Sequence, residues 1–219
     1  MKDFNTNSNE VGLKLNIDKT KTLAIGQQRR EIKIHIDEKL IEQKEDFEYL
    51  GYKLSSKGDQ CIAVNHRIGK GWEAFGKLKS VLTSKNVNID TKRSLYQTYI
   101  LSCVTYGMEC VSWTENLLNK MEVFQNHILR FMAGKTLNDR IPCNDLRHKF
   151  GITPICDFIK SRVVKLQQIT NSIGKGVSKI CFQGMVEGRR SRGRPKRRWR
   201  DNAKVWGNEE TPRKENNHK

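Results

Sequence analysis

The sequence lacks long apolar runs. It contains no stretch of about 20 apolar residues of the kind that a membrane-spanning helix requires, and no basic amphipathic segment with a large apolar face. The N-terminal segment also lacks the apolar core of a secretory signal peptide, so we expect the chain in the nucleus, with or without a cytoplasmic pool. Both compartments keep thiols reduced. We therefore predict that the cysteines are free thiols: Cys61, Cys103, Cys110, Cys143, Cys156 and Cys181.

The ligand patterns of metal sites are missing too. The sequence has no Cys-x2-Cys or His-x3-His pair, which zinc sites commonly use. The nearest grouping is Cys143, His148 and Cys156, and its irregular spacing favours buried thiols and a surface imidazole. There is no adjacent Asp-Asp pair, and the acidic pair Glu209-Glu210 lies in a polar segment. We therefore expect no metal and no cofactor on this chain.

Positive charge, by contrast, is abundant. Lys and Arg number 41 against 24 Asp and Glu, which gives a formal net charge of +17. Such an excess repels itself unless a polyanion compensates it, so it favours a nucleic-acid partner. We expect that partner to be RNA, DNA or an RNA–DNA hybrid and not a membrane; the sequence does not indicate an oligomeric state.

The apolar pattern divides the chain into three regions and predicts an α+β fold. Residues 1–58 alternate with period two at Ile32, Ile34 and Ile36, which indicates a small antiparallel sheet of three or four strands. Residues 59–172 change to a helical period. Residues 173–219 lose the apolar period and gain arginines, so we predict a basic, disordered tail.

The helical region has clear start and stop signals. We expect three to five helices, the first carrying an apolar stripe from Ile68 to Leu82 and the second starting at an Asp90 N-cap. Further signals are a start after Thr114 with a stop at Gly134, a short helix between Pro142 and Gly151, and a start at Thr153-Pro154. Trp72 and Trp113 are expected to be buried in this region.

Four motifs follow one another in a meaningful order. They are the segment from Gly12 to Gly26, with the pattern Gly-Leu-x-x-Asn-x-x-Lys-Thr-Lys; the run Phe47 to Gly51; Leu95-Tyr96 with Tyr106-Gly107-Met108-Glu109 and Trp113; and Arg192-Gly193-Arg194-Pro195-Lys196 with Trp199 and Asp201. In this order they resemble the end of the palm, the primer grip, the thumb and the C-terminal signature of LINE-type (non-LTR retrotransposon) reverse transcriptases. The resemblance covers residues 11–201. It implies a palm remnant over 1–58, a helical thumb over 59–172 and a nucleic-acid-binding tail over 173–219.

The resemblance also assigns residues. The palm motif falls on Gly12, Leu13, Asn16, Lys19, Thr20 and Lys21, and the primer grip on Phe47, Tyr49, Leu50 and Gly51. In the family Lys19 would protonate the departing pyrophosphate beside Mg²⁺-bound nucleotide. The aspartates that hold Mg²⁺ in the family belong to motifs that precede this segment, so we expect no complete catalytic site, an idle Lys19 and no independent polymerase activity.

The basic tail allows more than one mode of binding. Its candidate nucleic-acid contacts are Arg189, Arg190, Arg192, Gly193, Arg194, Pro195, Lys196, Arg197, Arg198, Trp199 and Arg200. Arg-Gly-Arg-Pro is also the core of the AT-hook, whose arginines enter the narrow minor groove of A·T-rich DNA. Non-specific phosphate binding, a nuclear-import signal and a solvated charge run are the other interpretations. Trp199 and Trp206 would either stack on bases or fold back onto the helices.

One departure from the family lies just before the tail. Many members carry an Arg-x-Leu-x-x-x-Gly-His-x-x-Arg run there, whereas this chain reads RVVKLQQITNSIGKG, without Gly-His. A decaying element and a host gene that adopted the element's tail both fit this loss. The main hypothesis is a truncated reverse transcriptase fragment that binds nucleic acid. The alternatives are a small nuclear DNA-binding protein with an AT-hook-like tail and a pseudogene product without a stable fold.

Overall fold

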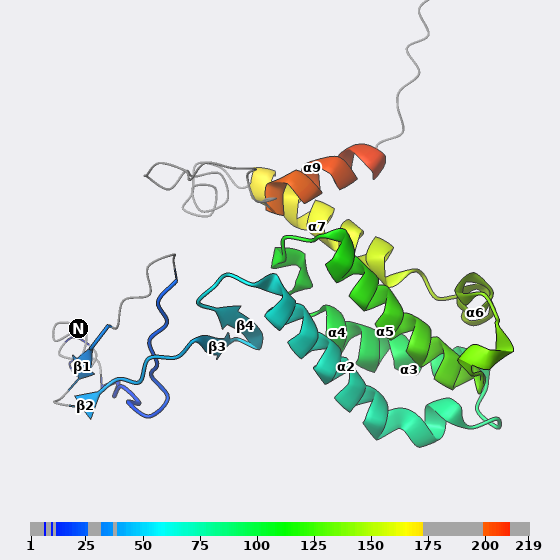
Figure 1. The fold of residues 1–219 in the computed structure, drawn as a ribbon, viewed down its shortest axis with the longest axis horizontal. Helices are drawn as coiled ribbons and strands as arrows, with labels where there is room; N and C mark the ends of the chain where they lie inside the picture. The colour runs from blue at the N-terminus through cyan, green and yellow to red at the C-terminus, as the bar shows by residue number, and fades with distance from the viewer. Residues whose placement is uncertain are drawn as a thin grey trace, which may run out of the picture. The chain divides into compact units, whose positions relative to one another are not determined.

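A computed structural model describes residues 12–25, 32–36, 39–172 and 199–210, together with two single positions nearer the N-terminus. The chain divides into two compact units, Met1–His66 and Arg67–Lys219 (Figure 1). Helices dominate, and the strands form two small antiparallel pairs. The predicted α+β class is therefore confirmed. Within the described residues, no helix is both long and apolar enough to span a membrane.

The first unit contains two separate hairpins where the sequence predicts one sheet of three or four strands. Strands β1 (His35–Ile36) and β2 (Lys39–Leu40) pair with each other, and β3 (Asp46–Tyr49) pairs with β4 (Tyr52–Ser55). Between them, Gln43 makes an isolated parallel bridge to Thr22. Because the linking segment uses its backbone groups on Thr22, the two hairpins do not merge in the described structure.

Helix α2 (Gln60–Thr83) starts in the first unit and continues into the second. Its predicted stripe faces inward: Phe75 and Leu82 are buried, and Ile68, Trp72 and Leu78 are half-buried. Gly71 allows close helix packing, because a Cβ at this position would lie 2.6 Å from a ring carbon of Phe124.

A continuous helical stretch follows, from Ile89 to Thr105. It consists of α3 (Ile89–Leu95), the π-helical turn η1 (Tyr96–Leu101) and α4 (Ser102–Thr105). The predicted N-cap Asp90 is wrong: the cap is Asn88, whose side chain accepts a hydrogen bond from the Thr91 amide at 2.7 Å. Asp90 lies one position inside the helix and pairs with Arg93.

The remaining helices follow the sequence signals closely. Helix α5 (Glu115–Ala133) is capped by Thr114 and ends at Gly134, which is left-handed with φ of 62°. Helix α6 (Cys143–Phe150) lies between Pro142 and a left-handed Gly151, and α7 (Ile155–Ser172) begins directly after Pro154. These boundaries are confirmed because the cap residues fix the backbone locally.

The core of the second unit combines apolar packing with satisfied polar groups. Trp113 is fully buried, as predicted, whereas Trp72 is half-buried. Gln125 on α5 is fully buried; its amide group donates to the Tyr96 hydroxyl and the Thr153 carbonyl, and its oxygen accepts from the Ile155 amide. One side chain thus joins η1, α5 and the start of α7.

The last described element is helix α9 (Trp199–Glu210), which packs on α7. The sequence predicts disorder from residue 173 onward, whereas this segment is helical. Its packing explains the difference, because Ala203 is fully buried and Trp206 is 6% exposed. Period-3.6 apolar residues are too few here to indicate this helix in isolation. Residues 173–198 lie outside the described part of the chain.

Candidate nucleic-acid interface

The palm-like motif forms a compact turn in the first unit. The Asn16 side chain accepts a hydrogen bond from the Lys19 amide at 3.0 Å, and the Thr20 hydroxyl donates to the Asn16 carbonyl at 2.8 Å. Gly12, just before the turn, has φ of 75°, a region that favours glycine. The spacing Asn-x-x-Lys-Thr is therefore the spacing of a self-capped turn. Leu13 and Lys19 are exposed.

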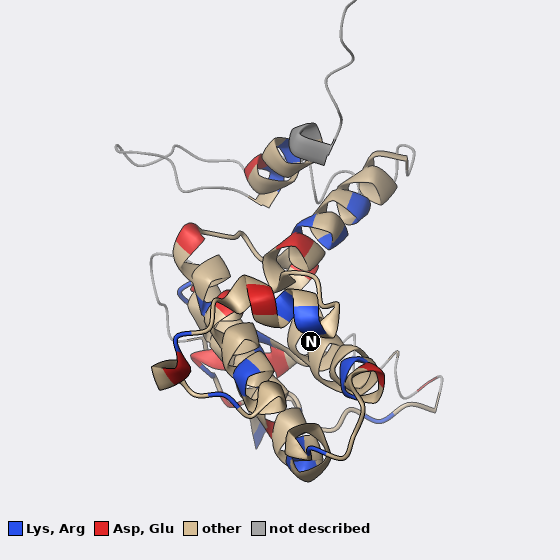
Figure 2. Ribbon diagram, turned by 90° about the vertical axis from the view of Figure 1, so that its right-hand side faces the viewer, with Lys and Arg blue, Asp and Glu red and all other residues tan. Residues whose placement is uncertain are grey.

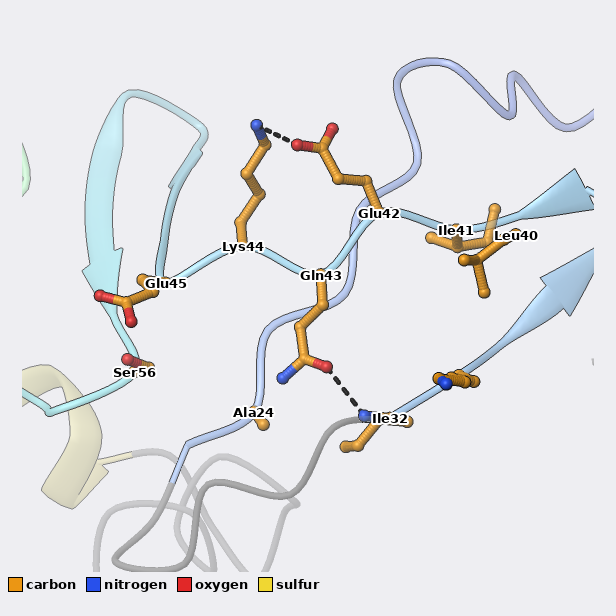
Figure 3. A pocket seen from close by; sticks show the side chains of 10 residues that line it. Ala24, Ile32, Leu40, Ile41, Glu42, Gln43, Lys44, Glu45 and Ser56 are labelled. Atoms are coloured by element: carbon orange, nitrogen blue, oxygen red, sulfur yellow. Dashed lines mark hydrogen bonds and ion pairs between the residues drawn. The ribbon is translucent and has the colours of Figure 1, made fainter.

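Lys21 leaves this turn and joins a small charge cluster. Its ammonium group lies 2.8 Å from Glu42, which also pairs with Lys44 (Figure 3). Hydrogen bonds from Lys21 and then Lys44 lower the pKa of Glu42 to about 2. The backbone adds to this contact, since the Thr22 amide donates to the Glu42 carbonyl and the Lys44 amide to the Thr22 carbonyl. Lys21 is thus engaged within the protein, whereas the exposed Lys19 side chain belongs to no ion pair that the structure shows.

A pocket of about 530 Å³ lies beside this cluster. The segment from Leu40 to Glu45 forms one wall, and Ala24, Ile32, Lys33 and Ser56 line the rest (Figure 3). Gln43 reaches across and accepts a hydrogen bond from the Ile32 amide at 2.8 Å. Because the rim carries both carboxylates and lysines, it offers no surface of single sign for a polyanion.

The primer-grip-like run forms the tip of the β3–β4 hairpin. Phe47 and Tyr49 lie on β3, and the two-residue turn consists of Leu50 and Gly51, both with positive φ, at 49° and 76°. Such turns match strand twist and usually employ Asn-Gly or Gly-Gly. Leu50 is both backbone-strained and 73% exposed, so the fold itself does not explain a leucine here.

The thumb-like motif forms a junction in the second unit. Tyr106 lies under the Arg67 guanidinium, whose carbon is 4.6 Å from the ring centroid. Gly107 is left-handed at φ of 70°, and the indole of Trp113 donates to the Met108 carbonyl at 3.1 Å. The segment Tyr106–Trp113 is thereby closed on itself around a buried tryptophan.

Helix α9 docks on this same junction. The Trp199 indole donates to the Glu109 carbonyl at 2.5 Å, and the Asn202 amide donates to the Trp113 carbonyl at 2.8 Å. Asn202 is 1% exposed. Two sequence motifs therefore meet in space. One is Tyr-Gly-Met-Glu with Trp113, and the other is the signature that contains Trp199, some 90 residues later in the sequence. Of the two uses considered for Trp199, the structure shows the contact with the helices.

A third helix completes the junction with an ion pair. Arg162 of α7 lies 3.1 Å from the Glu109 carboxylate and 3.5 Å from the Thr105 hydroxyl. The second carboxylate oxygen of Glu109 is buried without a hydrogen-bond partner in the described structure. Sequence reasoning identified Glu109 only as part of a motif and missed Arg162 and Asn202. Nothing in their local sequence signals a contact across 50 to 90 residues.

The positive charge is unevenly distributed. Residues 1–66 contain eleven Lys and Arg and eleven Asp and Glu, so they are balanced. Residues 67–172 contain sixteen against eight, and residues 173–219 contain fourteen against five. Figure 2 shows Lys and Arg in blue and Asp and Glu in red, scattered among other residues on the described helices. The whole excess thus belongs to the second unit, residues 67–219, which includes the tail.

The predicted tail contacts lie mostly outside the described residues. This applies to Arg189, Arg190, Arg192, Gly193, Arg194, Pro195, Lys196, Arg197 and Arg198. Trp199 is half-buried at the junction, whereas Arg200 is exposed on α9. Figure 1 places α9 alongside α7, in agreement with their packing.

Metal-ligating and thiol groups do not gather in the described structure. Over those residues, there is no group of three or more His, Cys, Asp or Glu side chains that could hold a metal ion. The five described cysteines are free, as predicted. Burial raises the pKa of Cys110, and raises that of Cys156 to about 12, so neither is a reactive thiolate near neutral pH.

Comparison with curated proteins finds similarity to a transposon-derived protein. The chain is 22% identical over 164 residues to a protein of Caenorhabditis elegans that is named transposon-derived and uncharacterized. The similarity covers 70% of this chain and 57% of that protein, so the chain matches little more than half of its relative's length. No family model matches the sequence. No solved structure matches it either.

Proposed function

We propose that this chain is a transposon-derived fragment of a LINE-type reverse transcriptase that binds RNA, DNA or their hybrid and does not polymerise on its own. The similarity to the transposon-derived nematode protein supports the origin. The ordered motifs support the finer assignment to reverse transcriptases. Two parts of the chain carry the excess positive charge: residues 67–172, which we call the helical unit, and the basic tail, residues 173–219. Together they would form the binding surface.

The docking of α9 on the Tyr106–Trp113 junction carries this proposal. Trp199 lies within the arginine-rich run, between Arg198 and Arg200, and its indole donates a hydrogen bond to the Glu109 carbonyl of the helical unit. A polyanion bound to those arginines is thereby held near a helical unit that itself has eight more cations than anions. Holding two weak binding surfaces together raises their joint affinity.

The proposed inactivity follows from chemistry. Phosphoryl transfer to a 3′ hydroxyl requires divalent ions held mainly by clustered carboxylates. The sequence contains no adjacent aspartates, and Lys19 is exposed in a turn, with no such cluster among the described residues. Purified chain with primer, template, nucleotides and Mg²⁺ is expected to give no extension; measurable extension refutes this part.

The salt dependence of binding tests the electrostatic part. If six to eight cations contact phosphates, affinity should fall about a thousandfold or more as salt rises from roughly 50 to 200 mM. Replacing Arg197 and Arg198 by Gln should lower the slope of log affinity against log salt by about two. Replacing Lys14 and Lys39 by Gln removes the same charge from the balanced first unit and should leave the slope unchanged. A weak slope in the wild type, or equal effects of both pairs, would exclude the proposed surface.

A second candidate is favoured by the Arg192-Gly193-Arg194-Pro195 run. As an AT-hook-like peptide it would bind A·T-rich minor grooves, and the chain would be a small nuclear DNA-binding protein. The substitution Arg194→Ala separates the two candidates. Loss of preference for A·T-rich over G·C-rich duplexes supports groove reading, whereas a uniform loss across sequences supports phosphate binding.

A further inference from the structure

An aromatic cluster lies between helices α2 and α5. The Trp72 ring contacts Phe75, Phe124 and Phe131 edge to face, with centroids 5.8, 5.3 and 6.2 Å apart, and His127 at 6.4 Å. Phe75 also contacts Phe131 at 5.4 Å. Phe75 and Phe124 belong to the buried core. The other three rings extend the cluster from the core toward the surface.

The outer part of the cluster is open to solvent. Phe131 is 43% exposed and Val123 is 44% exposed, while Trp72 and His127 are half-buried. We call Trp72, His127 and Phe131 the aromatic patch. Covering the exposed part of the Phe131 ring with a bound base would be favourable.

Two exposed glycines lie on the same helix as Trp72, within one turn of it. Gly69 lies three residues before Trp72 and Gly76 four residues after it, on the solvent side of the same face. A Cβ at either glycine would meet no atom within 4 Å, in contrast to Gly71, where core packing leaves no room. Glycine weakens a helix, and these two have no internal packing reason.

Lysines lie on both helices that carry the aromatic patch. On α5 the positions spaced by three or four residues are Lys120, Val123, His127 and Phe131, and on α2 they are Gly69, Trp72, Gly76 and Lys79. Each series contains one lysine. Glu73, which lies next to Trp72 on α2, pairs with Lys70 at 3.1 Å, and Lys135, which lies beyond the end of α5, pairs with Asp139 at 3.4 Å. Aromatic rings flanked by cations are the combination that binds single strands, because bases stack on the rings while the phosphates meet the lysines.

From these observations we infer that the aromatic patch is a stacking site for an unpaired base of single-stranded nucleic acid. The inference rests on the proposed nucleic-acid binding and adds the strand state that the helical unit prefers. A base paired within a duplex has both faces covered by its neighbours, so the patch favours single strands over duplexes of the same length.

The test compares full-length variants with a labelled oligothymidylate of about 12 nucleotides and with a duplex of the same length. Phe131→Leu removes the exposed ring but keeps an apolar side chain, and should weaken oligothymidylate binding about fivefold or more. Duplex binding should change less than about twofold, and the salt slope should stay the same because no phosphate contact is lost. Tyr99→Leu is the matched control, since it removes a ring that is 56% exposed on η1, outside the patch.

Gly76→Gln supplies a variant that keeps every ring. Its side chain would fill the space beside Trp72 and should also weaken oligothymidylate binding, although it favours the helix. Two results would overturn the stacking site: Phe131→Leu and Tyr99→Leu weaken oligothymidylate binding equally, or Phe131→Leu and Gly76→Gln do not weaken it at all. In either case, binding of nucleic acid by the wild type would still support the proposed function. Absence of wild-type binding to both probes overturns the proposed function itself.

Tryptophan emission gives a direct readout. Oligothymidylate should quench part of the emission of the wild type, and Trp72→Phe should lose the share that Trp72 contributes, because Trp113 and Trp206 are buried and the half-buried Trp199 is present in both proteins. Thermal unfolding of each variant checks that the fold is kept. If oligothymidylate quenches Trp72→Phe as strongly as the wild type, the bound base does not stack on Trp72, and the inference is overturned.

Discussion

The three glycines of helix α2 allow a sharp test of the packing described above. Gly69, Gly71 and Gly76 lie in one helix, and alanine at each position removes the same backbone freedom. In an unhindered helix this change stabilises by about 0.5–1 kcal/mol. The three sites differ only in their surroundings. Opposite effects at neighbouring sites therefore measure packing and not helix propensity.

At Gly71 the structure predicts a penalty. An added Cβ would lie 2.6 and 3.1 Å from two ring carbons of Phe124 and 3.2 Å from the Cβ of Val104. The ring belongs to the buried aromatic cluster and has little room to shift, so overpacking should cost about 1–3 kcal/mol. The net effect of Gly71→Ala is destabilisation, because this cost exceeds the gain in helix propensity.

At Gly69 and Gly76 the Cβ would meet no atom within 4 Å. Each alanine should therefore raise the free energy of unfolding by its full propensity gain, and the double variant by about 1–2 kcal/mol. For a unit of this size that corresponds to a melting temperature roughly 2–8 °C higher. Thermal denaturation followed by circular dichroism measures all three variants. If Gly69→Ala and Gly76→Ala destabilise as Gly71→Ala does, the described packing of α2 against α5 is wrong.

Four further predictions follow from single contacts. Leu50→Gly should stabilise the first unit by about 1 kcal/mol, because it relieves the positive φ of 49°; unchanged or lower stability in urea denaturation would mean that the turn is not strained. The Glu42 carboxyl should titrate near pH 2 by NMR. Its stabilising effect should be fully present above the ordinary pKa of 4.5 and be lost as the pH falls from 4.5 toward 2. The substitution Lys21→Met should raise the titration midpoint of Glu42, and an unchanged midpoint would exclude the Lys21–Glu42 ion pair. Gln125→Leu should lower the free energy of unfolding by about 3 kcal/mol, because it leaves the Thr153 carbonyl and the Ile155 amide without partners. Tyr96→Phe removes one hydrogen bond and should lower it by about 1 kcal/mol. Equal losses of stability in the two variants would contradict the central role of Gln125. Asn202→Ala should speed amide exchange in α9 but not in α5, and exchange that speeds equally in both would show that α9 is not a separate docked element.

Local sequence signals were sufficient for most of the helical unit. Thr114, Gly134, Pro142 and Gly151 each determine the backbone through their own chemistry, as a cap, a left-handed residue or a proline, and the helices end where these residues predict. Asn88 and Asp90 show the limit of such signals. Both residue types cap helices well, and the choice depends on which side chain reaches the Thr91 amide.

The first unit was predicted less well, because its strands are short and polar. A two-residue strand such as His35–Ile36 depends on its partner more than on its own pattern. The alternation at Ile32, Ile34 and Ile36 indicated an extended segment but gave no information on its pairing. The bridge between Thr22 and Gln43 joins segments that are 21 residues apart, and no turn signal could place it.

The junction at Tyr106–Trp113 shows why the candidate site could be read only in part. The sequence motifs identified both sides of the contact, yet they assigned Trp199 equally to base stacking and to packing. Only the fold decides between these two uses. Asn202 lies three residues after Trp199, and Trp206 lies four residues after Asn202. Both side chains are buried on the same face of α9, which holds the Trp199 indole against the Glu109 carbonyl. A tryptophan that is anchored in this way has less surface left for a base, so we expect base stacking at the rings that the fold leaves partly open, Phe131 and Trp72. Under this proposal, the aromatic rings that stack on bases are those on the exposed face of α2 and α5, and not the tryptophan that the sequence places among arginines.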